Sequence, residues 1–159
     1  MFKRIFRGIE HTFTLFISLP RPSHRRLLQH MVAFSRRLPR QFEQPLPAMM
    51  ANLTPRHPKK SSTISPNQMR QMADAVAAWH LLSPLGICLR RSLIRYHFLH
   101  SIGYPVQIVF GARLKDAKEG GGIGGHAWLL YDGQPYYENP KDYEGFVKMY
   151  VYPDKSTTE

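Results

Sequence analysis

The chain has 159 residues, of which 43% are hydrophobic and one is a cysteine, and its formal net charge is +11. This length fits one domain with a real hydrophobic core, and a single cysteine excludes an internal disulfide framework and a cysteine-based zinc site. No apolar run approaches the roughly 20 residues that span a bilayer, and Glu10 and His11 interrupt the apolar start before any signal-peptide cleavage site. We therefore expect a cytoplasmic protein without stable membrane insertion.

The positive charge is concentrated in the first part of the chain. Residues 1–60 contain 12 Lys and Arg against two acidic residues, whereas residues 61–159 contain 10 against nine. Such a field attracts acidic partners (nucleic acid, anionic lipid or an acidic polypeptide), although a solvated helical face has the same composition. We interpret residues 1–60 as a basic helical region with a proline-rich connection, and residues 61–159 as the core domain.

Two helices are expected in the basic region. Apolar residues recur at helical spacing over 2–17, and again between Ser23, the expected N-cap, and Pro39, the expected end. Residues 39–66 contain six prolines, so we expect a mostly irregular connection there.

Two further helices follow this connection. Pro66 stands at the first position of one helix, whose inward positions are expected to be Met69, Met72, Ala73, Val76 and Trp79. The next helix, over roughly 88–102, is apolar on most of its circumference, which is typical of a central buried helix, and Gly103 closes it.

The hydrophobic period then changes to that of β-strands, which are expected over 106–110, 126–131, 134–138 and 146–152. Asp132-Gly133 is a strong hairpin turn, and helices that precede an antiparallel run of strands indicate an α+β fold. Residues 120–125 satisfy G-x-G-x-x-G literally, but a dinucleotide site needs a following helix and a strand is expected here. We therefore predict no cofactor, and interpret this glycine-rich loop as a hinged flap.

Cys88 stands where the fourth helix begins, directly after Gly86 and Ile87, and His126 starts a strand behind the glycine-rich loop. The positive end of a helix favours a thiolate, and an imidazole can accept the thiol proton, so the two residues are candidates for a nucleophile and its base. A free cysteine is more often a small buried hydrophobe, which is the alternative interpretation. Trp128 shares the strand face of His126 and is expected to shield it. No His, Asp or Glu cluster has metal-ligand spacing, so we predict no metal.

A third group should orient the imidazole, and two neighbouring residues are candidates. A strict two-residue turn at Asp132-Gly133 places Asn139 opposite His126, whereas a three-residue turn places Glu138 there. We favour Glu138 and the three-residue turn, because a carboxylate stabilises the imidazolium that forms during attack.

Four segments occur in an order that resembles the lasso peptide B protein family. They are Cys88-Leu89-Arg90-Arg91-Ser92-Leu93, Gly103-Tyr104-Pro105, Val109-Phe110-Gly111-Ala112-Arg113, and Gly125-His126-Ala127-Trp128 with Asp132-Gly133. The resemblance is strongest over 84–139. It implies a papain/transglutaminase-like fold, a Cys88-His126-Glu138 triad with glutamate where the family has aspartate, and no cofactor. It also implies three partners: the precursor peptide, a leader-binding recognition protein and an ATP-dependent macrolactam synthetase.

The function expected from these features is hydrolysis of a peptide bond at the junction of leader and core in a lasso precursor peptide. A rival on the same scaffold is acyl transfer to an amine, as in transglutaminases and arylamine N-acetyltransferases. A rival of another class is a non-enzymatic basic adaptor that binds nucleic acid or membrane, although no nucleic-acid motif is present. We expect no nucleic-acid partner.

Overall fold

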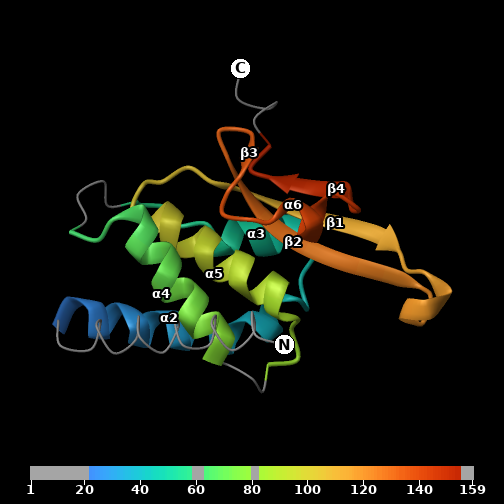
Figure 1. Cartoon of the computed structure of the whole chain (residues 1–159). Helices are drawn as coiled ribbons and strands as arrows, with labels where there is room; N and C mark the ends of the chain where they lie inside the picture. Colours follow the sequence, from blue (N-terminus) through green and yellow to red (C-terminus); the bar gives the residue numbers. More distant parts are fainter. Residues whose placement is uncertain (1–21, 59–62, 80–82, 155–159) are drawn as a thin grey trace, which may run out of the picture. The chain divides into compact units, whose positions relative to one another are not determined.

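The computed structural model describes residues 22–58, 63–79 and 83–154 of the chain. The helix expected over 2–17 lies outside these residues. The chain divides into two units, a helical one that ends at Tyr104 and a sheet-containing one that begins at Pro105. Helices precede an antiparallel sheet along the chain (Figure 1), so the predicted α+β class is confirmed. The predicted domain boundary between residues 60 and 61 stays a prediction.

The first described helix, α2 (Pro22–Gln41), presents one apolar side to the core of the helical unit. Its buried residues recur every three or four positions, and they are His24, Leu28, Met31, Ser35 and Leu38. Two sequence predictions about its ends are wrong. Ser23 lies inside the helix rather than at its N-cap, and α2 continues for two residues past Pro39. Proline lacks an N–H donor and crowds the carbonyl of the preceding turn, but in the last turn of a helix few hydrogen bonds remain to be lost.

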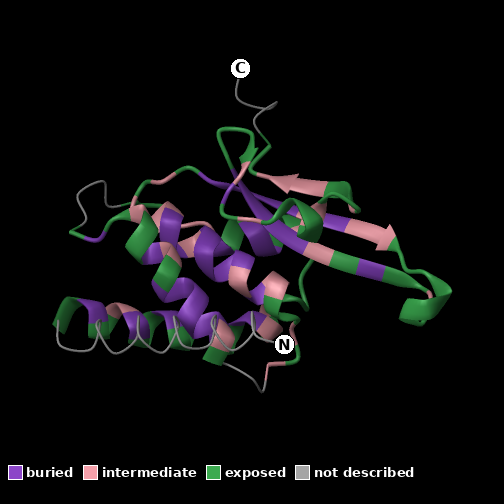
Figure 2. Cartoon of the chain, in the orientation of Figure 1, coloured by how far each residue is buried: buried purple, intermediate pink, exposed green. Residues whose placement is uncertain are grey.

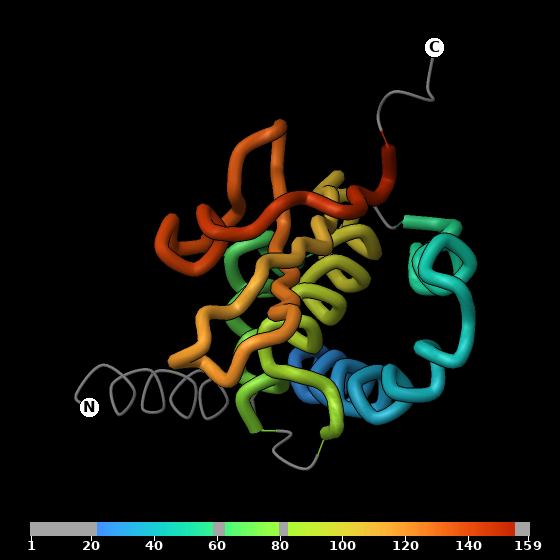
Figure 3. The backbone as a smooth tube through the Cα atoms, turned by 90° about the vertical axis from the view of Figure 1, so that its right-hand side faces the viewer, coloured from blue at the N-terminus to red at the C-terminus, as the bar shows by residue number. Residues whose placement is uncertain are grey.

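The connection expected to be irregular contains a helix, α3 (Leu46–Leu53), which Figure 3 shows as a separate coil after α2. Pro45 is its N-cap and Pro47 lies in its first turn, where the missing N–H of proline has no helical acceptor to lose. Met49 and Met50 are almost fully buried, so α3 contributes to the core. The proline content was therefore misleading, because these prolines begin a helix.

Helix α4 (Pro66–Trp79) begins as predicted, with Pro66 at its first position. Ser65 and Gln68 form a reciprocal cap, in which the Gln68 N–H donates to Ser65 Oγ and the Ser65 N–H donates to Gln68 Oε1. The predicted inward residues are buried except Trp79, which is 62% exposed. Trp79 is the last residue of α4, where the helical period no longer guarantees a packing partner.

Helix α5 (Ile87–Ser101) carries the cysteine and packs against α4 and α2 within the helical unit (Figure 1). The predicted burial of its middle is confirmed, since Leu93, Ile94, Tyr96 and Leu99 are 0% exposed. Gly103 follows it with a positive φ of 79°, the conformation for which glycine is favoured at a helix end.

A buried ion pair joins α4 to α5. Asp74, 7% exposed, accepts two hydrogen bonds from the Arg95 guanidinium, from Nε at 2.5 Å and Nη2 at 2.7 Å, and one from Arg70 Nη1 at 2.9 Å. Arg95 is itself only 3% exposed. The pair fixes which faces of the two helices meet, because a buried charge is tolerated only beside its partner.

His97, on the same helix, links α5 to α2 and α3. Its Nδ1–H donates to the Leu53 carbonyl oxygen at 2.6 Å, and its ring stacks on Phe34 with a centroid distance of 4.2 Å. Burial lowers the pKa of His97, the hydrogen bond to Leu53 opposes this shift, and the charge of His100 adds to it. The folded state therefore favours the neutral imidazole.

The sheet-containing unit has four antiparallel strands in the order β3-β2-β1-β4. They are β1 (Gln107–Leu114), β2 (Ile123–Tyr131), β3 (Gln134–Pro135) and β4 (Val147–Tyr152). Between β1 and β2 lies the short 3-10 helix η1 (Ala117–Glu119), followed by Gly120, Gly121 and Gly122, all with positive φ. Gly124 and Gly125 belong to β2, so only the first half of the expected flap is a turn, and no helix follows it.

The turn between β2 and β3 contains two residues, so the predicted three-residue turn is wrong. Tyr131 pairs directly with Gln134, and Asp132 and Gly133 have φ values of 50° and 76°. Two left-handed residues give the turn twist that matches paired strands. Strand β3 is also shorter than predicted, because Tyr137 has a φ of 52° and turns the chain out of the ladder.

A hydrophobic cluster lies on one face of this sheet. Val109, Trp128 and Leu130 are buried together, and Tyr143, Phe146 and Val151 pack against them. Tyr143 ends the one-turn helix α6 (Pro140–Tyr143), which precedes β4. Across the described residues, no helix has the length and hydropathy needed to cross a bilayer.

We expect Asp74→Asn to lower the free energy of unfolding by about 3 kcal/mol, because it leaves the buried Arg95 charge without its counterion. Thermal and denaturant unfolding measure this change. Asp142→Asn, on the exposed α6, is the matched control and should change stability by less than about 0.5 kcal/mol. Equal effects of the two substitutions would contradict a stabilising role for the pair.

We also expect His97 to make the helical unit sensitive to acid. With a pKa lowered in the folded state, the imidazole contributes stability above its unfolded pKa of about 6.5, and this contribution is lost as the pH falls below that value. His97→Gln should make the decline of unfolding free energy below about pH 6.5 shallower, by at most about 1.4 kcal/mol per pH unit. Urea unfolding at several pH values tests this, with exposed His30→Gln as the control.

Candidate active site

Cys88 is the second residue of α5 and is partly exposed. Gly86 is the N-cap of the helix, and no side chain caps the helix there. The helical ladder starts with Arg90 N–H, which donates to Gly86 O at 3.1 Å, so the amides of Ile87, Cys88 and Leu89 precede it. The thiol therefore stands beside amide donors that precede the helical ladder, at the positive end of α5. This position was predicted from the sequence.

Arg90 fixes the chain that leads into this helix end. The guanidinium is buried, and it donates from Nε and Nη2 to Ala77 O at 3.1 and 2.6 Å and from Nη1 to Leu85 O at 3.2 Å. All three bonds go to backbone carbonyls: two to Ala77 on α4, and one to Leu85 just before Gly86. Burial lowers the pKa of Arg90. Arg90 thus holds the N-terminus of α5 against α4.

The role of Arg90 was not predicted, although the sequence carries a signal for it. An arginine two residues after the cysteine lies on a helix predicted to be apolar nearly all round. A charged side chain in that setting needs internal acceptors, and the exposed carbonyls at the end of a preceding helix supply them.

His126 lies on β2, directly opposite Gly111 of β1. Its ring stacks near Trp128, with centroids 5.7 Å apart and an interplanar angle of 21°, and meets Phe146 at 5.2 Å. The predicted contact with Trp128 is confirmed, while the contact with Phe146 was not foreseen. The imidazole is thus half-buried between two aromatic side chains on the face that carries the hydrophobic cluster.

The aromatic layer depends on a glycine opposite the histidine. A Cβ on Gly111 would lie 2.6 Å from Trp128 Cζ3 and 2.8 Å from Trp128 Cη2, closer than side chains approach. Trp128 is 1% exposed and stacks on Tyr143 at 5.9 Å, so its ring has little room to move. A glycine inside a strand signals such a close approach, which the sequence analysis did not use.

An ion pair also lies beside Phe146. The Arg113 guanidinium lies 5.3 Å from the Phe146 ring and donates to both oxygens of Glu119 at 2.7 and 2.8 Å. The hydrogen bonds from Arg113, followed by the one from the Asp116 backbone, lower the pKa of Glu119 to about 2. The hairpin connection between β1 and β2 is thereby tied to the aromatic layer around His126.

The two candidates for the third group lie after the break in β3. The ladder ends with Tyr136 N–H donating to Leu129 O at 2.8 Å, so neither register argument reaches residues 138 and 139. Asn139 is exposed and is the N-cap of α6, where its Oδ1 accepts from Lys141 N–H at 3.1 Å. Glu138 is half-buried. The role of Glu138 in a triad stays a prediction.

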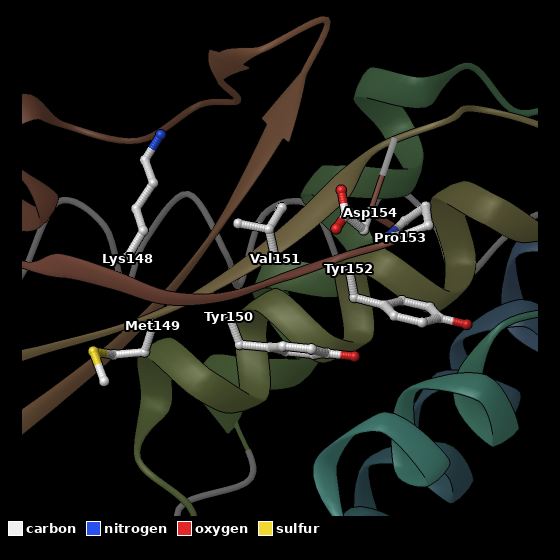
Figure 4. Close-up of a pocket in the computed structure, with 7 residues that line it drawn as sticks. All are labelled: Lys148, Met149, Tyr150, Val151, Tyr152, Pro153 and Asp154. Atoms are coloured by element: carbon white, nitrogen blue, oxygen red, sulfur yellow. The ribbon is translucent and has the colours of Figure 1, made fainter. Parts of the chain in front are cut away.

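A groove of about 610 Å³ runs along β4, the edge strand of the sheet (Figure 4). Tyr150 and Tyr152 point to one side of the strand, with ring centroids 6.4 Å apart, and Lys148 points to the other. Burial raises the pKa of Tyr150. None of the predicted site residues lines this groove. Among the described residues, no group of three or more His, Cys, Asp or Glu side chains could hold a metal ion.

The chain was compared with protein families, with curated proteins and with solved structures. The family model of the transglutaminase-like superfamily matches residues 28–151, a segment that includes Cys88, His126 and Glu138. No curated protein and no solved structure gives a significant match. The match covers well over half of the chain and extends from α2 to β4. A domain of this kind implies a cysteine-dependent hydrolase or acyltransferase. The chain belongs to the transglutaminase-like superfamily.

Proposed function

We propose that the chain is a leader peptidase, which hydrolyses the bond between leader and core in a ribosomally made lasso precursor peptide. The observation that carries the proposal is the position of Cys88 in the first turn of α5, beside amides that precede the helical ladder. The family match and the ordered Cys88, Gly103, Gly111 and His126 segments support it.

In the proposed reaction, the Cys88 thiolate attacks the scissile carbonyl carbon while His126 holds the thiol proton. The C–N bond of the tetrahedral intermediate breaks, and His126 gives that proton to the leaving amine. The product left on the enzyme is a thioester between Cys88 and the leader. Water, deprotonated by His126, hydrolyses this thioester and restores the thiol.

The backbone N–H of Cys88 is the proposed donor to the oxyanion of the tetrahedral intermediate. Amides in the first turn of a helix can donate to an anion because they have no acceptor within the helix. Glu138 is the proposed partner of the His126 imidazolium. Phe146 and Trp128 limit the access of water to the imidazole and fix the plane of its ring. Their ring centroids lie 5.2 and 5.7 Å from the centroid of the His126 ring.

The proposal also names partners. The substrate is the precursor peptide, a leader-binding recognition protein presents it, and an ATP-dependent macrolactam synthetase uses the free α-amine that cleavage creates. We place the reaction in the cytoplasm, where such precursors are made.

Acyl transfer to an amine is the second candidate, because the superfamily match fits it equally well. The acyl-enzyme is the same, and an amine replaces water as its acceptor. Mass spectrometry of products formed with and without a primary amine separates the two. An amide product at the expense of the free leader would favour transfer.

We expect Cys88→Ala to reduce leader cleavage by at least about 1,000-fold, because it removes the nucleophile. Cleavage of a precursor peptide, followed by mass spectrometry in the presence of its recognition protein, measures the loss. Ser101→Ala, which deletes a hydroxyl at the far end of the same helix, is the matched control and should retain activity. A folded Cys88→Ala protein that cleaves as fast as the wild type would contradict the assignment of Cys88 as the nucleophile.

We expect Glu138→Gln to lower kcat by at least about 100-fold while the protein stays folded, because the imidazolium loses its charged partner. Asn139→Ala removes the N-cap of α6 and should cost about 1 kcal/mol of stability with a mild effect on kcat. Steady-state kinetics and thermal unfolding of both variants separate the two roles. The reverse ranking of kcat values would assign the third position to Asn139.

A further inference from the structure

The outward side of α2 is strongly basic. Its 20 residues include no acidic residue, and none of its buried positions is an arginine. Buried and exposed residues alternate along α2 (Figure 2). We define the arginine face as the five exposed arginines Arg25, Arg26, Arg36, Arg37 and Arg40. At 100° per residue they fall within one arc of the helix opposite Leu28 and Met31, and His30 borders that arc.

These five guanidinium groups have no carboxylate partner among the residues that the structure describes. The ion pairs of the described chain lie elsewhere, on Asp74 and Glu119. Arg36 and Arg40 are one helical turn apart, and like charges at that spacing destabilise a helix by a few tenths of a kcal/mol. An anionic partner would relieve this repulsion along the whole face.

The composition of the face separates the possible anionic partners. An interfacial helix places its apolar side in the membrane, but the apolar side of α2 already packs on α4 and α5. Single-stranded nucleic acid is bound with aromatic side chains that stack on bases, and the arc contains no Phe, Tyr or Trp. Its other exposed residues are Pro22, Gln29 and Ala33, and Val32 lies beside it. All five cations are arginines, whose planar fork can bind both oxygens of a carboxylate through paired hydrogen bonds.

We propose that the arginine face of α2 docks an acidic segment of a polypeptide. From Arg25 to Arg40 the face extends about 22 Å along the axis, so the segment should present carboxylates over four turns of a helix or about seven extended residues. Helix α2 also contacts α5, so a polypeptide held there is bound to the unit that carries Cys88. The inference rests on α2 alone and does not require Cys88 chemistry.

The test is direct binding of a fluorescent 20-residue peptide with glutamate at helical i, i+3 and i+4 spacing, measured by anisotropy in 150 mM salt. A glutamine-for-glutamate peptide is the ligand control. One variant carries Arg25→Gln, Arg26→Gln, Arg36→Gln, Arg37→Gln and Arg40→Gln. The matched variant loses the same five charges at exposed positions elsewhere, by Arg56→Gln, Lys115→Gln, Lys118→Gln, Lys141→Gln and Lys148→Gln.

We expect the α2 variant to bind the glutamate peptide at least about 10-fold more weakly than the wild type, and the matched variant to lose less than about 3-fold. If the five-fold variant fails to fold by circular dichroism, Arg25→Gln with Arg37→Gln replaces it, with a smaller loss expected. Equal losses in the two variants would reduce the effect to net charge and overturn the proposal.

Failure of the wild type to prefer the glutamate peptide over the glutamine peptide would overturn it as well. Duplex DNA of 20 base pairs and phosphatidylglycerol vesicles are tested in parallel. Binding of either through the arginine face, without binding of the glutamate peptide, would assign the face to phosphate groups instead of polypeptide carboxylates.

Discussion

The position of Cys88 within the helical unit depends on two buried arginines of α5, Arg90 and Arg95. Arg95 is paired with Asp74 of α4, and Arg90 donates to the end of α4 and to the residue before the N-cap. A buried guanidinium is tolerated only where its donors meet acceptors, so each arginine selects one register between the two helices. An apolar interface of the same area would permit sliding by a turn, which would carry the thiol several ångströms along the helix axis. The charges therefore set where the first turn of α5 lies within the helical unit.

The imidazole is positioned by a different kind of interaction. His126 lies in a layer of aromatic rings, with Trp128 and Phe146 beside it and Tyr143 behind Trp128. The Arg113–Glu119 pair extends this layer to the hairpin connection, where the carboxylate remains ionised down to about pH 2. Stacked rings restrict the rotation of the imidazole and so fix the plane of its ring.

Periodicity and helix signals predict much of the fold. The Pro66 start, the buried face of α4, the position of Cys88 in the first turn of α5 and the Gly103 end follow from local rules, because each depends on residues within one turn. The errors have physical causes that lie further away. The prolines around α3 begin a helix that is buried by residues distant in the sequence. Tyr137 ends the β-ladder because it has a positive φ, which is not predictable for a tyrosine from the local sequence. For the same reason, the predicted pairing of His126 with residue 138 or 139 does not occur, because the β2–β3 ladder ends before them. Phe146 was missed because its contacts with His126 and Arg113 join segments that are far apart in the sequence.

Gly111 and Trp128 occupy one volume that is shared between two adjacent strands. The indole of Trp128 on β2 fills the space that a Cβ at position 111 on β1 would need. That Cβ would lie 2.6 Å from Trp128 Cζ3, which is too close for both groups to be accommodated. Each residue therefore limits what the other position accepts. A larger side chain at position 111 fits this sheet only if Trp128 is replaced by a smaller residue. The change in unfolding free energy of the double substitution should therefore differ strongly from the sum of the two single changes. The aromatic surface beside His126 is therefore determined by positions 111 and 128 together. Substitutions at these two positions are expected to occur as a pair.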